Sequence, residues 1–86
     1  MNEKKRKRLI HKIAVEIVSR HKIETAELAG GKKSLKRQYC GKIYELIVSV
    51  TKNGDDEITI DDVVEEMVKI LQIDLDHEIG QNSKGG

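Results

Sequence analysis

The chain contains no proline, phenylalanine or tryptophan, and it has only one cysteine and two tyrosines among its 86 residues. A single cysteine, Cys40, cannot form a disulfide within the chain, which favours a reducing compartment such as the cytoplasm. Without large aromatic side chains, the core has to be built from isoleucine, valine and leucine. The absence of proline, together with many Glu, Lys and Ile residues, predicts a helical chain.

The sequence also lacks an apolar run of the roughly 20 residues that a membrane-spanning helix requires. The N-terminus has the basic start of a signal peptide, but His11, Lys12 and Glu16 interrupt the apolar stretch that follows it. No small-residue cleavage site comes after this stretch. We therefore expect a soluble cytoplasmic protein with no membrane association.

A chain of 86 residues forms one small domain. Cations at the start of a helix are opposed by the helix dipole, so we predict a basic, frayed arm over residues 1–8. The helical domain is predicted over residues 9–75, and a polar, disordered tail over residues 76–86. Because the aliphatic core of such a domain is thin, a homodimer is consistent with the sequence.

Apolar residues recur at steps of three and four, which predicts a small all-α domain of three to four helices with an aliphatic core. The first helix is expected over residues 3–21. A short helix, TAELA, is expected to be capped by Thr25 and ended by the pair Gly30–Gly31. The next helix is expected over residues 34–51, with Ser34 as its cap.

Residues 47–60 admit two interpretations. The β-branched segment IVSVT, the turn residues KNGDD and the alternating EITI together indicate a β-hairpin. The helical stripe nevertheless continues unbroken through this segment, which favours a helix that ends at Asn53–Gly54. The last helix then starts near Asp61, with Thr59 or Asp61 as its cap.

The net charge of +1 conceals a strong asymmetry. Residues 1–52 carry a net charge of +9 and residues 53–86 a net charge of −8. The basic half is either a surface for an anionic partner or a face that packs against the acidic half and is neutralised by it. Both interpretations are open at the level of the sequence.

The stretch TKNGDDEITIDD, residues 51–62, resembles an EF-hand loop, and apolar residues at matching spacings extend the resemblance over residues 43–70. The calcium ligands that the resemblance implies are Asn53, Asp55, the backbone carbonyl of Glu57, and Asp62. The expected first Asp is replaced by Thr51 and the sharp-turn glycine by Asp56, and no second loop is present. Since only two direct ligands are carboxylates, we predict no metal site and favour an acidic connection between helices.

The segment IETAELAGGKKSLKRQYCGKIYELI contains a T-x-E-L-A run, a glycine turn and a basic helix start, and residues 24–47 resemble a helix-turn-helix DNA-binding unit. In such a unit the N-terminal turns of the second helix contact the DNA. The contact residues that the resemblance implies are Lys32, Lys33, Lys36, Arg37 and Gln38. The N-terminal arm adds candidate phosphate contacts at Lys4, Lys5, Arg6, Lys7 and Arg8.

No catalytic pattern is present in the sequence. The three histidines are dispersed, Cys40 has no second cysteine for a zinc pair, and we expect its thiol to be half-buried. The consecutive acidic pairs Asp61–Asp62 and Glu65–Glu66 suit the positive end of a helix dipole better than acid–base chemistry.

We therefore predict a non-enzymatic, cofactor-free protein that binds nucleic acid or acts as a regulator, with duplex DNA or structured RNA as its partner. The chain has only two tyrosines, which argues against a partner that is single-stranded and stacks its bases on aromatic side chains. The alternative is a helical protein–protein interaction module with a degenerate EF-hand shape.

Overall fold

The structure is a computed structural model that describes residues 2–51 and 57–85, with side chains as far as Ile79. In these two ranges the chain forms three α-helices, one short 3-10 helix and no strand. The elements are α1 (Glu3–Arg20), η1 (Thr25–Gly30), α2 (Gly31–Thr51) and α3 (Ile60–Gly85). The predicted all-α class is confirmed, and the β-hairpin interpretation is wrong because α2 is helical to its end at Thr51.

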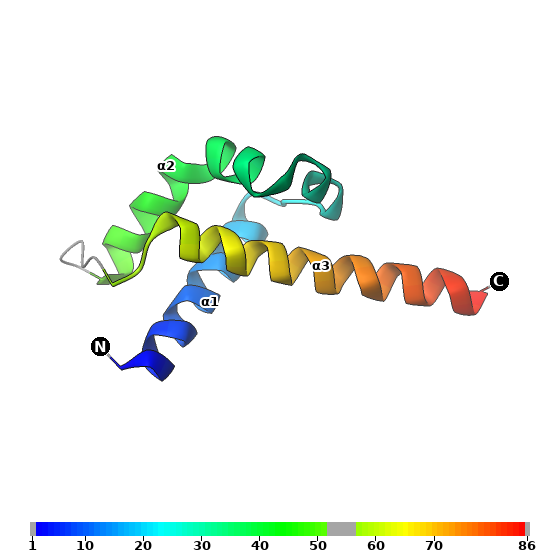
Figure 1. The fold of residues 1–86 in the computed structure, drawn as a ribbon, viewed down its shortest axis with the longest axis horizontal. Helices are drawn as coiled ribbons and strands as arrows, with labels where there is room; N and C mark the ends of the chain where they lie inside the picture. The colour runs from blue at the N-terminus through cyan, green and yellow to red at the C-terminus, as the bar shows by residue number, and fades with distance from the viewer. Residues whose placement is uncertain (1, 52–56, 86) are drawn as a thin grey trace.

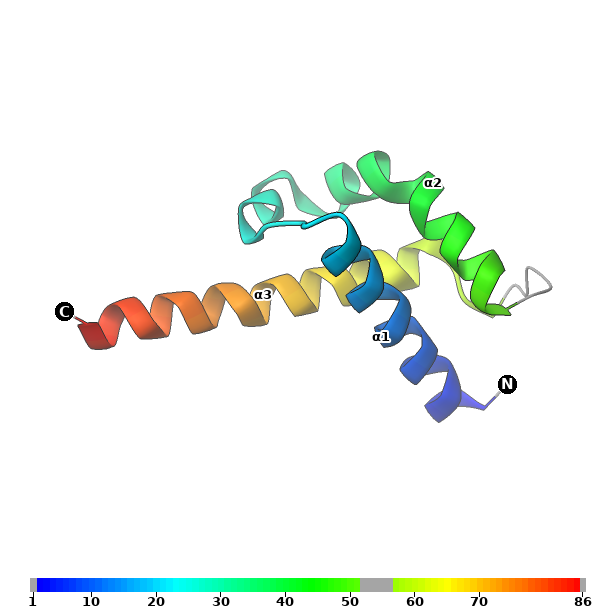
Figure 2. The same ribbon diagram turned by 180° about the vertical axis from the view of Figure 1, so that it is seen from behind.

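The helices are arranged around the first half of α3. Figures 1 and 2 show α1 and α2 packed against that half, while the second half of α3 extends beyond them toward the C-terminus. The molecule is accordingly elongated, with extents of 51 × 27 × 19 Å. None of the helices in the described ranges is both long enough and apolar enough to cross a membrane.

The core is aliphatic, as predicted, apart from one methionine. No polar or charged residue is buried in the described part of the chain. Full burial of an aliphatic side chain contributes about 1.5–3 kcal/mol, so these residues supply most of the favourable free energy of folding. The buried residues are Ile10, Ile13, Ala14, Ile17, Ile23, Leu35, Ile43, Ile47, Ile58, Val63, Val64, Met67 and Leu71.

The N-terminal segment, predicted to be a frayed arm, is helical from Glu3 onward. Asn2 is the N-cap of α1, and its side-chain oxygen accepts a hydrogen bond from the backbone N–H of Lys5 at 2.8 Å. Glu3 lies in the first turn and pairs with Arg6 at 3.2 Å. A cap and a carboxylate at this position offset the unfavourable interaction of the neighbouring cations with the helix dipole.

The start of α2 also differs from the prediction. The N-cap of η1 is Glu24 rather than Thr25, and the Glu24 backbone N–H donates to the Glu27 carboxylate at 3.2 Å. Gly31 ends η1, as predicted, with a φ of +77° that favours glycine. Because α2 begins directly at Gly31, Ser34 lies inside the helix rather than capping it.

Thr59 and Asp62 form a reciprocal cap at the start of α3. The Thr59 hydroxyl accepts from the backbone N–H of Asp62 at 3.1 Å, and the Asp62 carboxylate accepts from the backbone N–H of Thr59 at 3.1 Å. The prediction that Thr59 or Asp61 caps this helix is therefore resolved in favour of Thr59. The helix continues to Gly85, through the segment from residue 76 onward that was predicted to be disordered. The Thr25 hydroxyl lies 3.5 Å from the Glu78 carboxylate, so η1 contacts α3 within that segment.

A hydrogen bond joins η1 to α2. The Tyr39 hydroxyl donates to the Glu27 carboxylate at 2.8 Å, and the Tyr39 ring lies 6.0 Å from the His21 ring between centroids. Desolvation by burial raises the pKa of the Tyr39 phenol, and the hydrogen bond to Glu27 and the negative charge of Glu27 raise this pKa further.

Replacing Tyr39 by Phe is expected to lower the free energy of unfolding by about 1 kcal/mol at neutral pH, because the hydrogen bond is lost while the ring remains. Since folding raises the pKa of this phenol, its contribution to stability is present below about pH 10 and is lost as the pH rises further. Urea unfolding of both proteins should show a stability difference that shrinks above about pH 10. Tyr44→Phe at the exposed tyrosine is the matched control, and a Tyr39→Phe difference that is constant with pH would contradict this account.

Candidate nucleic-acid interface

The two consecutive acidic pairs of the sequence lie in the first turns of α3 and divide between its two neighbours. Successive residues of an α-helix point about 100° apart, so the two members of each pair cannot face the same way. Asp61 and Glu65 face α2, whereas Asp62 and Glu66 face α1. The pairs were interpreted from the sequence as responses to the helix dipole, and the structure gives them specific partners as well.

On the α2 side, two cations one helical turn apart meet two carboxylates one turn apart. Lys36 Nζ lies 2.9 Å from Asp61 Oδ1, and Lys32 Nζ lies 3.5 Å from Glu65 Oε1. The two helices run antiparallel here, since the higher-numbered lysine meets the lower-numbered carboxylate. All four side chains are half-exposed or more, so each pair contributes at most about 1 kcal/mol.

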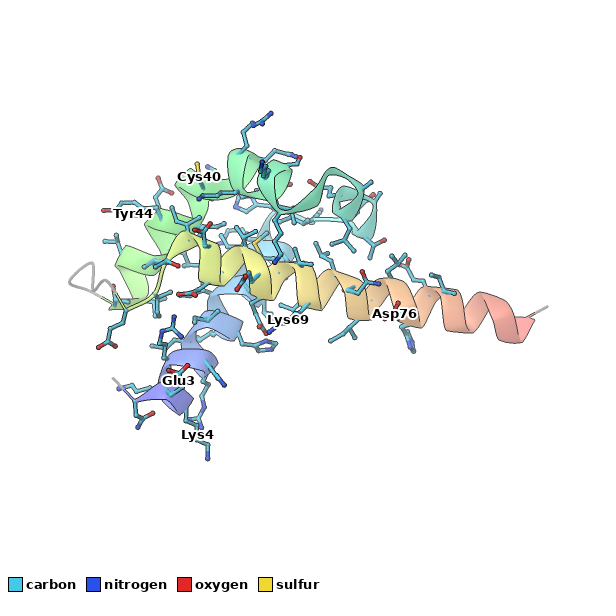
Figure 3. All side chains as sticks on the ribbon, viewed as in Figure 1. Glu3, Lys4, Cys40, Tyr44, Lys69 and Asp76 are labelled. Atoms are coloured by element: carbon cyan, nitrogen blue, oxygen red, sulfur yellow. The ribbon has the colours of Figure 1, made fainter. Side chains whose placement is uncertain are left out.

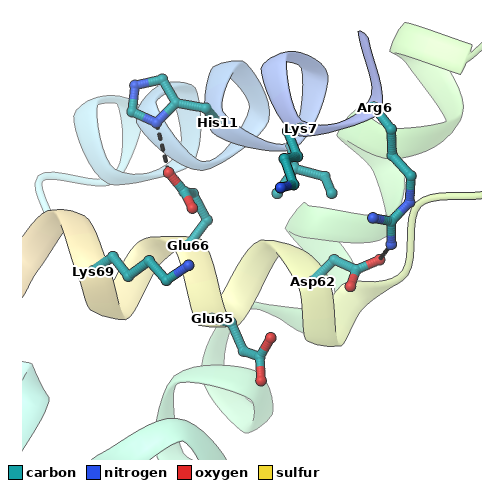
Figure 4. A pocket seen from close by; sticks show the side chains of 8 residues that line it. Arg6, Lys7, His11, Asp62, Glu65, Glu66 and Lys69 are labelled. Carbon is teal, nitrogen blue, oxygen red and sulfur yellow. Dashed lines mark hydrogen bonds and ion pairs between the residues drawn. The ribbon is translucent and has the colours of Figure 1, made fainter. Parts of the chain in front are cut away.

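On the α1 side, Arg6 makes the more enclosed contacts. Its guanidinium donates to Asp62 Oδ2 at 2.7 Å and to the backbone carbonyl oxygen of Glu57 at 2.7 Å. The Arg6 and Asp62 side chains are only 28% and 24% exposed, so solvent screens this pair less than the lysine pairs. One helical turn further along, His11 Nδ1 lies 2.7 Å from Glu66 Oε2 (Figure 4).

These contacts show that part of the charge asymmetry is neutralised inside the molecule. Three of the ten predicted nucleic-acid contacts, Arg6, Lys32 and Lys36, are ion-paired with carboxylates of α3. A fourth predicted contact, Gln38, is neutral, and its side-chain amide donates a hydrogen bond to the Ser34 hydroxyl at 3.0 Å. The remaining six predicted cations have exposed side chains with no ion pair or side-chain hydrogen bond to another described residue, and these are Lys4, Lys5, Lys7, Arg8, Lys33 and Arg37.

The structure separates these six cations into two groups. In Figures 1 and 2 the first turns of α1 lie at the end of the molecule where α2 finishes. Lys33 and Arg37 belong instead to the first turns of α2. Figure 3 shows Lys4 projecting from the free end of α1. The exposed cations of the basic half therefore form two surfaces on two helices.

One further cation was missed at the level of the sequence. Lys12 is exposed and lies four residues after Arg8, so it continues the outward side of α1. The four-residue spacing of Lys4, Arg8 and Lys12 was the available signal. The prediction of a frayed arm over residues 1–8 obscured this spacing, because it separated Lys4 and Arg8 from the helix that contains Lys12.

Two of the oxygen atoms that the EF-hand resemblance assigns to calcium are held by Arg6. The Glu57 carbonyl and the Asp62 carboxylate both accept hydrogen bonds from its guanidinium. The other two implied ligands, Asn53 and Asp55, lie outside the described residues, as does the predicted helix stop at Asn53–Gly54. Within the described ranges, no group of three or more His, Cys, Asp or Glu side chains is placed to hold a metal ion.

A hollow of about 450 Å³ lies between α1 and α3 (Figure 4). Its lining contains equal numbers of lysine or arginine and of aspartate or glutamate side chains, so it presents no field of one sign to a charged ligand. Small-molecule pockets are mainly apolar, and this lining is mainly charged. The lining residues are Arg6, Lys7, Ile10, His11, Asp62, Glu65, Glu66 and Lys69. The exposed cations are thus the stronger candidate for a functional surface.

Comparison of the chain with protein-family models, with curated proteins and with solved structures gave no match. Cys40 is exposed, and the expectation of a half-buried thiol is wrong because α2 turns this residue away from the core.

Replacing Arg6 by Gln is expected to lower the free energy of unfolding by about 2 kcal/mol, because a partly buried carboxylate and a carbonyl lose their charged donor. The matched control is Arg8→Gln, which removes the same charge two residues away from an exposed position. Urea denaturation of both variants measures the difference. Equal losses of stability in the two variants would mean that Arg6 has no special structural role.

Proposed function

We propose that this protein binds duplex nucleic acid through the outward side of α1, by contacts to the phosphate backbone. The observation that supports the proposal is that the cations from Lys4 to Arg8 point in different directions. Arg6 turns inward and holds α1 against α3, while the cations on either side of it are exposed.

Helical geometry places the exposed cations on a continuous stripe. With 3.6 residues per turn, Lys4, Arg8 and Lys12 lie along one side of α1, opposite the buried stripe that includes Ile10 and Ile13. The stripe extends over about 12 Å, a length of duplex DNA that carries about seven phosphate charges on its two strands. A row of cations at this density suits electrostatic binding to a polyanion.

The fixed helix also favours this binding mode. A frayed arm would have to be ordered on binding, at a cost in conformational entropy of about 1–2 kcal/mol per residue. The Asn2 cap and the Arg6 contacts order these residues in the free protein. The stripe contains lysine and arginine without neutral polar side chains for base edges, so we expect little dependence on nucleotide sequence.

The helix-turn-helix mode is a second way to bind the same partner, and it stays a prediction. It would use the first turns of α2, where Lys33 and Arg37 are exposed. Lys32 and Lys36, however, would have to leave the carboxylates of α3. For this reason the geometry favours α1 over α2 as the contact surface.

Three variants with equal changes of net charge distinguish the two surfaces. Lys4→Ala/Arg8→Ala removes two cations from α1, Lys33→Glu reverses one on α2, and Lys42→Glu reverses an exposed cation outside both surfaces. Fluorescence anisotropy of a labelled duplex of arbitrary sequence, titrated at several salt concentrations, measures affinity and its salt dependence. We expect the α1 variant to bind at least about tenfold more weakly and the slope of log affinity against log salt to fall by about 1.8.

The other two variants should bind nearly as well as the wild-type protein. A selective loss in Lys33→Glu, with the α1 variant unchanged, would assign binding to α2 and support the helix-turn-helix mode. Wild-type protein that does not bind the duplex even at low salt would contradict the proposed function.

A further inference from the structure

The outward side of α2 has features that the fold of a single chain does not explain. The inward side buries Leu35, Ile43 and Ile47. The outward side nevertheless carries another large side chain, Tyr44, which is 59% exposed. Figure 3 shows Tyr44 and Cys40 projecting from α2 away from the body of the molecule.

Gly41 lies in the middle of this outward side. A Cβ atom added at Gly41 would meet no atom within 4 Å, and the residue has no positive φ that would require glycine. Glycine inside a helix is unfavourable relative to alanine. No contact with the described residues therefore accounts for a glycine here, whereas close approach by a second helix would account for it.

The charges around Gly41 indicate what that second helix is. Arg37 lies four residues before Gly41 and Glu45 four residues after it, so both flank the glycine on the outward side of α2. Both side chains are exposed, and neither pairs with another described residue. When two copies of α2 cross antiparallel with a two-fold axis at Gly41, Arg37 of each copy faces Glu45 of the other.

We propose that two copies of this chain associate through the outward sides of their α2 helices, with the two-fold axis passing beside Gly41. Gly41 allows the helix backbones to approach, two Arg37–Glu45 pairs fix the antiparallel direction, and Tyr44 supplies apolar contact next to the axis. A parallel crossing would bring Arg37 against Arg37 of the other copy, which is repulsive. One helix pair is smaller than a standard interface of about 1,600 Å², so the dimer is reversible.

This dimer is independent of the proposed nucleic-acid surface, because Lys4, Arg8 and Lys12 of α1 lie outside the interface. Arg37, which the helix-turn-helix mode would use to contact DNA, is instead engaged by the second copy. Dimer formation and DNA binding by α1 can therefore be measured separately on the same variants.

Sedimentation velocity of the full chain over a range of concentrations, without nucleic acid, tests the proposal. The wild-type protein is expected to show a reversible monomer–dimer equilibrium. Arg37→Glu and Glu45→Arg should each weaken the dimer at least tenfold, and the charge-swapped protein Arg37→Glu/Glu45→Arg should recover most of the affinity. Lys22→Glu, at an exposed cation between α1 and η1, is the control and should leave the equilibrium unchanged.

Gly41→Gln separates loss of the dimer from loss of the fold. The added side chain enters open space in the single chain and improves helix propensity, so circular dichroism should show a folded protein that melts at or above the wild-type temperature. The same variant should be monomeric. A wild-type protein that stays monomeric at all concentrations, or a dimer that persists in Gly41→Gln and in both single charge variants, would overturn the proposal.

Discussion

The fold depends on the burial of the first three turns of α3 between α1 and α2. Val63, Met67 and Leu71 lie in an aliphatic core that has no large aromatic side chain. Such a core is thin, and its contribution to stability has to be supplemented at its edges. The carboxylates on either side of the buried stripe provide these edge contacts, because each one meets a cation or a histidine of the adjacent helix.

This arrangement divides the basic half of the chain by the direction in which each cation points. Cations that face α3 hold the helices together, and those that face solvent are available to a partner. Arg6 and Arg8 illustrate the difference, since they are two residues apart and Arg6 alone contacts α3. The same division applies to α2, where Lys36 meets Asp61 while Arg37 points away. Net charge along the sequence is therefore a poor guide to function until the inward-facing residues are identified.

The features that could be predicted from the sequence are those that arise from neighbouring residues. The stripe of Ile10, Ile13 and Ile17, the end of η1 at Gly31 and the Thr59 cap all follow from local spacing or capping chemistry. The start of α1 at residue 3 was predicted correctly, but the order of its first turns and the start of α2 were not, because local signals competed. The Asn2 cap outweighs the cations after it, and Ser34 is preceded by a glycine that already begins the helix. The partition of the charges could not be predicted, because Arg6 meets an acceptor 56 residues away in the chain.

The cations of this protein divide into an internal set and an external set. Two-dimensional NMR of the side-chain N–H groups of arginine, recorded during titration with a short DNA duplex, tests this division. We expect the Arg8 resonance to shift and broaden with added duplex while the Arg6 resonance stays in place, because Asp62 and the Glu57 carbonyl hold its guanidinium. A large shift at Arg6, or at Arg37 with Arg8 unchanged, would contradict this division.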